Sequence, residues 1–155
     1  MRKGGGYRHP SSEETLREKV VDEYGNIRSD EQGYMQGGDV FNFVIREIPR
    51  DIKKTLEYAG DTADSFDYIV FHQANNFINA YIAKKMKLDT DKIPSTIAKY
   101  GNTSSVSVPL TIVSELKDRL YGNKKLLLSA FGVGMTWATG IVPFVDCKIS
   151  DIVEV

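Results

Sequence analysis

Residues 68–75 of the sequence read Tyr-Ile-Val-Phe-His-Gln-Ala-Asn, a short apolar run followed at once by polar side chains. A run of this length and composition is typical of a strand that is buried on both faces. The polar residues then lie at the carboxyl end of that strand, where open α/β sheets usually form their binding sites. This stretch therefore predicts both a buried strand and a first candidate for chemistry, His72.

Amphipathic helices are predicted on either side of this strand. The first covers about 39–59, is expected to bend near Pro49 and stops before Gly60; the others cover about 74–87 and 104–120. On the second helix the apolar stripe is predicted to be Phe77, Ile78, Tyr81, Ile82 and Met86, with Asn79 off it. On the third the buried positions are predicted to be Val106, Leu110, Val113, Leu116 and Leu120.

Three further strands are expected: a weak one at 93–97, one around 126–128, and one at 137–145 after a glycine-rich corner. Helices that alternate with short apolar strands favour an α/β domain, a layered mixed sheet with helices on both sides and its last two strands antiparallel. The helices are few for covering both faces. The domain is therefore expected to pack against something outside this chain.

The first part of the chain differs from the rest in composition. Residues 1–34 are polar and glycine-punctuated, which indicates a loop or lid segment, and 35–155 then form the domain. Within the first segment, Ser11-Ser12-Glu13-Glu14 is typical of the start of a short capped helix, and Tyr24-Gly25-Asn26 of a hairpin or plain turn.

Composition excludes several functional classes. The chain has 155 residues, of which 41% are hydrophobic, and 20 basic against 21 acidic side chains leave no global field for nucleic acid or a membrane surface. The single cysteine, Cys147, excludes an internal disulfide framework and is compatible with a reducing cytoplasm. No apolar run reaches the roughly 20 residues of a bilayer span. Only two histidines are present, so we expect a soluble, cytoplasmic protein without a metal centre.

Three segments bring together residues suited to a reaction at a carbonyl group: 71–75, 100–104 and 131–137. The imidazole N–H of His72 and the side-chain amide of Asn102 would donate to an oxygen that becomes negative, and a backbone N–H near Val133 would serve a second oxyanion. Gly132 and Gly134 would let the backbone approach a ligand closely.

Each segment alone has an ordinary structural explanation. A lone histidine after a strand is usually a hydrogen-bonded structural residue, and Gly101-Asn102 is a common turn dipeptide. A glycine-rich corner often only bends a strand, and Lys84 and Lys85 are most simply a solvated helix face. The functional interpretation depends on the three segments occurring together.

Together these segments resemble the condensing enzymes of the thiolase-like superfamily, and within it the C-terminal half of the 3-oxoacyl-[acyl-carrier-protein] synthase III family. The resemblance runs through Phe71-His72-Gln73-Ala74-Asn75, Tyr100-Gly101-Asn102-Thr103-Ser104 with Pro109, and Phe131-Gly132-Val133-Gly134 with Thr136-Trp137, and covers roughly residues 33–145. It implies a thiolase-like fold and a Cys-His-Asn site, in which cysteine takes an acyl group from coenzyme A. Malonyl-carrier protein then loses carbon dioxide, and the enolate attacks the acyl-enzyme.

The resemblance also implies roles for individual residues. His72 and Asn102 would hold the malonyl thioester oxygen as it becomes an enolate, and the backbone N–H of Val133 would complete the oxyanion hole of the acyl-cysteine. Substrate-binding and oxyanion-hole neighbours would be Gly132, Gly134, Gln73 and Asn75, and basic residues for docking the acyl carrier protein would be Lys84 and Lys85. Coenzyme A and carrier-protein thioesters would be substrates, with no resident cofactor.

Two departures from the family pattern bear on partners and activity. Phe77 stands where the family usually has an arginine, and nothing here corresponds to the N-terminal half that carries the family's cysteine. Cys147 is in the wrong place to replace it and is expected to be a quiet structural thiol. The chain is therefore expected to be inactive alone and to work with the missing half, acyl carrier protein and acyl-coenzyme A. Concentration-dependent association, such as a homodimer, is expected if an apolar face is exposed.

Two other functions stay open at this point. One is a binding or scaffolding module that kept the fold and gave up catalysis, suggested by the absent cysteine and by Phe77. The other is a polyketide-forming or acyl-transferring condensing enzyme, since the same histidine and asparagine would serve it.

Overall fold

The computed structural model describes residues 4–19, 21, 24–33 and 35–153. It divides the chain into two compact units, Met1–Val40 and Phe41–Val155. The division falls within the first turn of helix α2 (Gly37–Ala59), whereas the segmentation at 34/35 drawn from the sequence remains a prediction.

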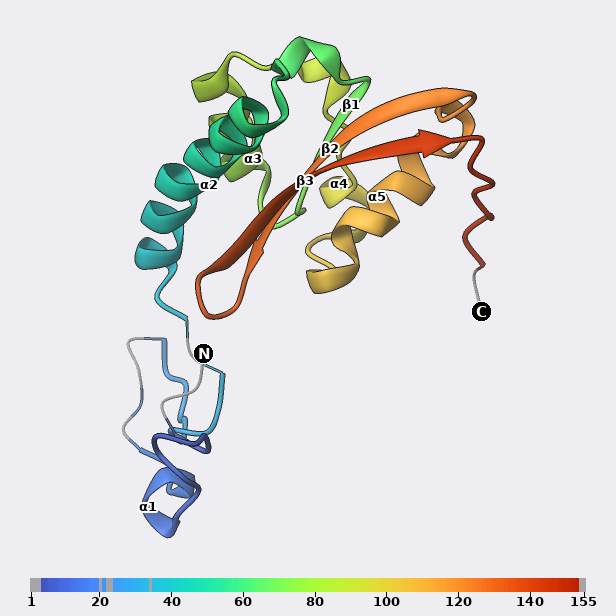
Figure 1. The fold of residues 1–155 in the computed structure, drawn as a ribbon. Coiled ribbons are helices and arrows are strands. Elements are labelled where there is room, and N and C mark those ends of the chain that lie inside the picture. Colours follow the sequence, from blue (N-terminus) through green and yellow to red (C-terminus); the bar gives the residue numbers. More distant parts are fainter. Residues whose placement is uncertain (1–3, 20, 22–23, 34, 154–155) are drawn as a thin grey trace. The chain divides into compact units, whose positions relative to one another are not determined.

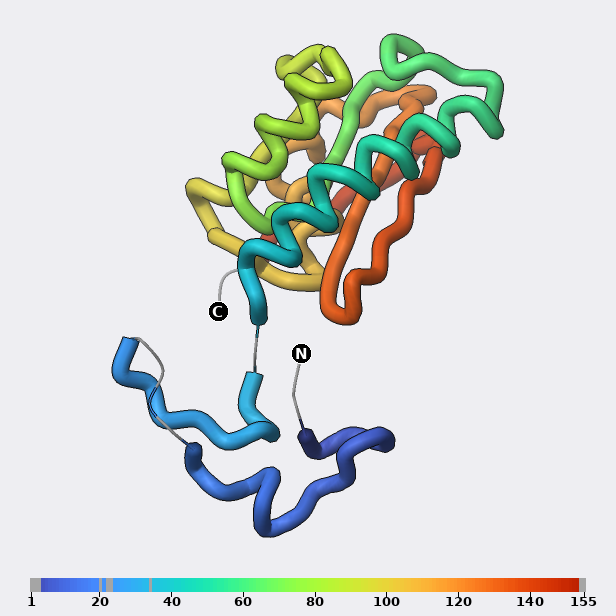
Figure 2. The backbone as a smooth tube through the Cα atoms, turned by 90° about the vertical axis from the view of Figure 1, so that its left-hand side faces the viewer, coloured from blue at the N-terminus to red at the C-terminus, as the bar shows by residue number. Residues whose placement is uncertain are grey.

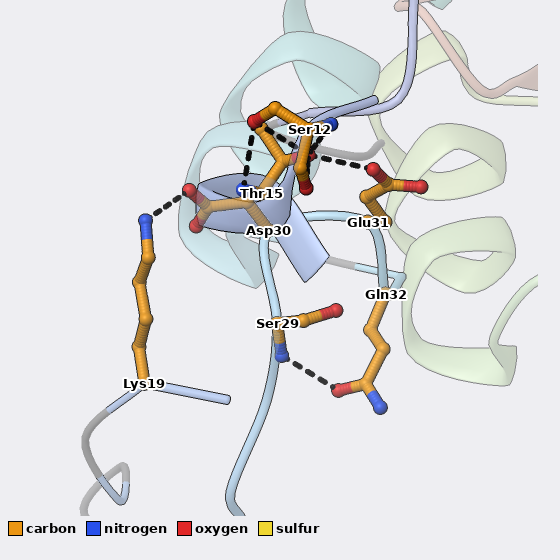
Figure 3. Close-up of polar contacts among 7 residues, drawn as sticks. All are labelled: Ser12, Thr15, Lys19, Ser29, Asp30, Glu31 and Gln32. Atoms are coloured by element: carbon orange, nitrogen blue, oxygen red, sulfur yellow. Dashed lines mark hydrogen bonds and ion pairs between the residues drawn. The ribbon is translucent and has the colours of Figure 1, made fainter. Parts of the chain in front are cut away.

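The first unit is organised by polar contacts around the short helix α1 (Glu13–Leu16) (Figure 3). The Ser12 side chain accepts from the backbone N–H of Thr15 at 3.1 Å, and the Thr15 hydroxyl in turn accepts from the Ser12 N–H at 2.8 Å. Thr15 also donates to Glu31, and Lys19 pairs with Asp30 at 2.6 Å. The capped helix that the sequence predicts is confirmed.

No residue with a side chain is buried in the described part of this unit. An antiparallel bridge joins Lys19 and Arg28, and Gly25 between them has φ +81°. Large apolar side chains described in this unit are exposed, among them Tyr7, Leu16, Tyr24, Ile27 and Met35. The described part of the unit is therefore organised by hydrogen bonds and ion pairs and contains no buried apolar side chain.

The second unit opens with the long helix α2. The helix continues through Pro49, and one face of it is buried by Phe43, Val44, Ile48 and Ile52. It stops at Gly60, which adopts φ +67° and lets the Asp61 N–H reach back to a carbonyl of the last turn, as predicted.

A three-stranded mixed sheet forms the centre of the second unit (Figure 1). Its strands are β1 (Tyr68–Phe71), β2 (Asn123–Gly132) and β3 (Thr136–Val145), in that spatial order. β1 pairs with β2 in parallel, and β2 pairs with β3 as an antiparallel hairpin. The buried strand predicted at 68–71 and the antiparallel final pair are therefore confirmed, with β2 in the middle of the three strands.

The weak strand predicted at 93–97 is wrong. Residues 93–96 are irregular between the 3-10 turn η2 (Thr90–Lys92) and the short helix α4 (Ile97–Tyr100). Pro94 has no N–H to give to a sheet ladder. The N–H of Thr96 bonds to the Gln73 side chain, so a side chain takes the place of a neighbouring strand.

Helices lie on both sides of the sheet (Figures 1 and 2). Helices α2 and α3 (Asn76–Met86) cover one face, and α5 (Ser107–Leu116) covers the other. Three further 3-10 turns are η1 (Ala63–Ser65) and the two that flank α5, η3 (Ser104–Val106) and η4 (Lys117–Arg119). The α5 face encloses a core cluster of Val70, Ile112, Leu116, Leu120 and Leu126. The layered α/β architecture expected from the sequence is confirmed.

Several details of helix orientation differ from the prediction, and Tyr81 of the predicted stripe is 37% exposed. Phe77 is 66% exposed and stacks on Phe41 at 5.9 Å between ring centroids, so it lies on the surface of α3. Asn79, placed off the buried stripe, is buried because its amide donates to the His72 carbonyl at 3.2 Å. Val106 is exposed, since it lies in the 3-10 turn before α5 and not on the helix itself.

Candidate active site

The buried polar side chains of the described chain gather at the carboxyl end of β1. Hydrophobic residues fill the rest of the interior, which makes this gathering distinctive. Its members are His72, Gln73, Asn79, Thr96, Ser107, Thr111 and Ser129. None of the seven is a carboxylate, a lysine or an arginine, so the cluster is built almost entirely from uncharged hydrogen-bonding groups.

His72 continues directly from β1. Its backbone N–H donates to the carbonyl of Ser129 at 2.9 Å, which extends the parallel ladder by one bond. Its Nδ1 lies 2.6 Å from the hydroxyl of Ser107, and its ring meets Phe131 edge-on with 5.0 Å between centroids. Nε2 has no hydrogen-bond partner within the described residues, so it is the ring atom that is free to meet a ligand.

Burial lowers the pKa of His72 below its ordinary value of 6.5, because removing the ring from water disfavours the imidazolium. The imidazole is therefore neutral at pH 7. A neutral ring carries one proton, and it can act as a hydrogen-bond donor at one nitrogen and as an acceptor at the other.

Gln73 joins β1 to the irregular segment that precedes α4. Its Nε2 donates to the Phe71 carbonyl at 2.8 Å, while its Oε1 accepts from the Thr96 N–H at 3.0 Å and from the Ser95 hydroxyl at 3.1 Å. The side chain is fully buried and engaged at both ends. Through these hydrogen bonds, Gln73 fixes the backbone next to His72 at the end of β1.

Asn102 follows helix α4, not the strand predicted there. Gly101 adopts φ +66° and ends the helix, and the Ser104 N–H donates to the Asn102 Oδ1 at 2.9 Å. That bond fixes which end of the amide faces the backbone and leaves the Nδ2 group as a donor with no acceptor among the described residues. The neighbouring Thr103 hydroxyl is buried and also lacks a partner there.

The glycine corner is the turn of the β2–β3 hairpin. Gly132 and Thr136 are its last paired residues, so Val133, Gly134 and Met135 form the loop. Gly134 and Met135 both have positive φ, and Val133 is 82% exposed. Val133 is therefore open to solvent, and its carbonyl accepts from the Thr136 hydroxyl at 3.1 Å; the role of its backbone N–H as an oxyanion donor remains a prediction.

Contacts of His72 connect the three segments. Ser107 begins the helix that follows Asn102, and Phe131 immediately precedes Gly132. The ring of His72 touches both residues, so it contacts the start of the helix after the asparagine turn and the strand end before the hairpin turn. That the Asn102 amide and the His72 ring share one oxygen remains a prediction.

Two other predicted residues have structural partners. Asn75 caps α3 by accepting from the Phe77 N–H at 2.7 Å. Lys85 donates to the carbonyl of Ile45 at 2.8 Å, a carbonyl that Pro49, four residues on, cannot serve because proline has no N–H. Lys84 is exposed on the same helix. Lys84 and Lys85 as a docking pair stay a prediction.

Sequence reasoning missed five members of the cluster: Asn79, Thr96, Ser107, Thr111 and Ser129. The usable signal was the pair Ser107 and Thr111, which recur four residues apart and continue into the buried Ile112 and Leu116. Taking Ser107 and Thr111 as buried positions of α5 would have predicted that their hydroxyl groups face the sheet.

Other parts of the described chain do not compete with this cluster. A depression of about 460 Å³ lies at the opposite end of the sheet and contains none of the three segments; it is lined by Asp67, Asn123, Lys124, Lys125, Ile141, Pro143 and Val145.

Among the residues described, no three His, Cys, Asp or Glu side chains are grouped as metal ligands. No helix there combines the length and apolarity needed to cross a membrane. Cys147 is free and exposed beyond β3.

Known proteins are similar to this chain in sequence and structure. The family model described as 3-oxoacyl-[acyl-carrier-protein (ACP)] synthase III C terminal matches residues 56–144. A beta-ketoacyl-[acyl-carrier-protein] synthase III of Streptococcus gordonii is 44% identical over 112 residues, which are 70% of this chain and 34% of that protein. The chain thus spans about a third of the curated relatives that it matches.

Solved structures agree with this similarity. A 3-oxoacyl-(acyl-carrier protein) synthase from Burkholderia xenovorans is 42% identical, with a TM-score of 0.75 over 80% of this chain and 36% of that one. A 3-oxoacyl-(acyl-carrier-protein) synthase III structure gives a TM-score of 0.80 at 36% identity, over 94% of this chain and 42% of that one. Both structural matches support the predicted thiolase-like fold.

Proposed function

Because the chain belongs to the 3-oxoacyl-[acyl-carrier-protein] synthase III family and matches its C-terminal part, we propose that it supplies two side chains to a carbon–carbon bond-forming site. The reaction joins malonyl-carrier protein to an acyl group taken from acyl-coenzyme A, with loss of carbon dioxide, in fatty acid synthesis. His72 and Asn102 are the two side chains.

The observation that carries this proposal is the neutral, buried His72, whose Nε2 has no hydrogen-bond partner in the part of the chain that the structure describes. As the bond from the malonyl methylene to its carboxylate breaks, the electron pair moves into the thioester and charge develops on the carbonyl oxygen. Two N–H donors, from His72 and the Asn102 amide, stabilise that oxygen. Neither donor needs to change its protonation state during the step.

Condensation then needs an acyl group on a cysteine. The enolate carbon attacks the acyl carbonyl, the new carbon–carbon bond forms, and the cysteine leaves as thiolate. The backbone N–H of Val133, on the exposed hairpin turn, donates to the oxyanion of this second step. Cys147 is exposed beyond β3, so the nucleophile comes from the two thirds of the relatives that this chain does not span. Alone, the chain does not condense thioesters.

Partners follow from the same chemistry. The covering N-terminal part, an acyl carrier protein and acyl-coenzyme A are the expected ones, with Lys84 on the exposed side of α3 as a contact for the acidic carrier. The adjoining surface is apolar, since Phe77 stacks on Phe41 in the open. The substrates are thioesters in solution, and a cytoplasmic location fits them.

The test combines the chain with the cysteine-bearing N-terminal part of a relative and measures carbon dioxide release from malonyl-carrier protein. His72→Ala and Asn102→Ala should each lower the rate by about 10²–10³, the usual effect of removing one preorganised donor. His9→Ala, which changes the other, exposed histidine, is the matched control and should leave the rate unchanged. A folded complex that releases no carbon dioxide would count against the proposal.

A binding module is the second candidate, favoured by the exposed Phe77 in place of a basic residue. A module of that kind would bind a carrier protein in titration calorimetry, and the folded complex with the N-terminal part would show no turnover. A polyketide-type condensing domain would be recognised instead by its products, because its use of His72 and Asn102 would be the same.

A further inference from the structure

The hydroxyl of Ser107 lies between two groups at the end of β1. Ser107 is 1% exposed, its Oγ is 2.6 Å from the Nδ1 of His72, and the backbone N–H of Gln73 reaches the same Oγ at 3.3 Å. A backbone N–H can only donate, so Gln73 uses one lone pair of the hydroxyl. The hydroxyl proton then needs an acceptor of its own.

Within the described residues, the only acceptor that the Ser107 hydroxyl contacts is Nδ1 of His72. If Nδ1 carried the ring proton instead, the hydroxyl would receive two N–H groups and its own proton would be buried without a partner. An unsatisfied buried polar group is costly, so the arrangement with the proton running from Ser107 to Nδ1 is the stable one.

We propose that Ser107 is a positioning residue that donates to Nδ1 of His72 and thereby holds the imidazole in the tautomer with its proton on Nε2. This rests on the proposed function, because only that tautomer presents an N–H donor to the thioester oxygen at the free nitrogen. The opposite tautomer would present a lone pair to an oxygen that is gaining negative charge.

The start of α5 is built to hold this hydroxyl in place. Thr111 donates to the carbonyl of Ser107 at 2.7 Å, and its Oγ1 lies 2.9 Å from the Oγ1 of Thr96. Gln73, which binds the N–H of Thr96, ties the same segment back to β1. The hydrogen bonds of Thr111 run to Thr96 and to the Ser107 carbonyl and not to the imidazole of His72, although Thr111 is buried in the same network. It therefore offers a control that disturbs the network without touching the ring.

The tautomer is read directly by nuclear magnetic resonance of the ¹⁵N-labelled chain at pH 8, from the long-range ¹H–¹⁵N correlations of the imidazole nitrogens. His9→Gln assigns the two histidines. We expect His72 to carry its proton on Nε2 in the unaltered chain and in Thr111→Val. We expect a mixture of both tautomers in Ser107→Ala, and the unaltered pattern to return in Ser107→Thr, which restores a hydroxyl.

Turnover of the complex with the N-terminal part gives a second, independent readout. Ser107→Ala should lower kcat on the order of tenfold with little change in KM, because proton position and ring orientation are lost while substrate binding is kept. Ser107→Thr should recover most of this loss. The tautomer measurement needs neither partner nor turnover, so an inactive complex would weaken the proposed function and leave this inference standing.

Two results would overturn the inference. One is an unaltered chain whose His72 carries its proton on Nδ1, a measurement that does not depend on any variant folding. The other is a folded Ser107→Ala chain that keeps a single Nε2–H tautomer, since the hydroxyl would then not be what selects it.

Discussion

The two ends of strand β1 use opposite kinds of polar interaction. At the amino end, Asp67 accepts from the Lys125 backbone N–H at 2.8 Å and from the Lys124 side chain at 3.0 Å, and Asp61 pairs with Lys125 at 2.6 Å. These charges are partly open to solvent. At the carboxyl end, His72 and its neighbours are buried, and their bonds run between uncharged groups.

The difference shows which end is prepared for chemistry. Exposed ion pairs contribute little and are screened by salt, so they suit a surface that only has to stay folded. Buried neutral donors keep a fixed orientation, and in a low dielectric they act strongly on a charge that develops nearby. The hydrogen-bond and ring partners of His72 among the described residues are uncharged, so burial is what lowers its pKa.

The largest effect is expected from breaking the carboxyl end at Gln73. Gln73→Ala removes three hydrogen bonds and leaves the Phe71 carbonyl and the Thr96 N–H buried without partners. We expect the free energy of unfolding to fall by about 3 kcal/mol, the sum of such unsatisfied groups. Urea unfolding followed by circular dichroism measures it.

A matched control for this change is Asn123→Ala, which removes an exposed amide at the opposite end of the sheet. It should alter stability by less than about 0.5 kcal/mol. Equal losses of unfolding free energy in Gln73→Ala and Asn123→Ala would mean that the buried network stabilises the fold no more than an exposed amide does.

A smaller effect should appear when the pH is changed. The pKa of His72 is lower in the folded state than its ordinary 6.5, so the unfolded chain binds more protons below that pH. Its contribution to stability is complete above about pH 6.5 and is lost as the pH falls toward the folded pKa. The slope for one proton is at most about 1.4 kcal/mol per pH unit.

His72→Gln separates this contribution from the other end of the strand. Urea unfolding between pH 5 and 8 should show a shallower dependence in the variant than in the unaltered chain. The pKa of Asp67 is lowered chiefly by its bond from the Lys125 N–H, so its contribution is present above the ordinary 3.8 and is lost only in stronger acid. Identical slopes in the two chains above pH 5 would contradict the assignment to His72.

The smallest effect is expected at the amino end. Asp67→Asn removes the charge of a half-exposed carboxylate while keeping an oxygen for the Lys125 N–H. We expect a loss of at most about 1 kcal/mol, shrinking further in 1 M salt, since the ion pair is screened. Thermal unfolding at low and high salt measures both values, and a loss that salt does not change would show that the bond, not the charge, matters.

The sequence was sufficient for elements whose own residues dictate them. The run Tyr68–Phe71 predicted the buried strand, Gly60 predicted the end of α2, and the two stretches flanking Gly132–Gly134 predicted the hairpin. The apolar pattern of a strand and the positive φ of a glycine are both local properties of the chain. Local properties can be read without knowing what lies across the fold.

Other features depended on partners that are far away in sequence. Residues 93–96 have strand-like composition, yet the Thr96 N–H donates to the side chain of Gln73 and not to a neighbouring strand. Gln73 lies more than twenty positions upstream. Asn79 is buried because its amide donates to the His72 carbonyl, and Ser107 is buried because its hydroxyl contacts the His72 ring. Such pairings are decided by tertiary contact, so the periodicity of a helix can indicate which of its faces is buried but does not identify the partner.

The proline inside α2 has a consequence for how this protein can change over evolutionary time. Pro49 leaves the Ile45 carbonyl without a donor from its own helix, and Lys85 of α3 fills that role. An amine engaged in this way is not free for a partner, and replacing Pro49 by alanine would let the helix reclaim the carbonyl and release the amine. Positions 49 and 85 should therefore covary, and a lineage that loses the proline acquires a mobile cation on the surface of α3.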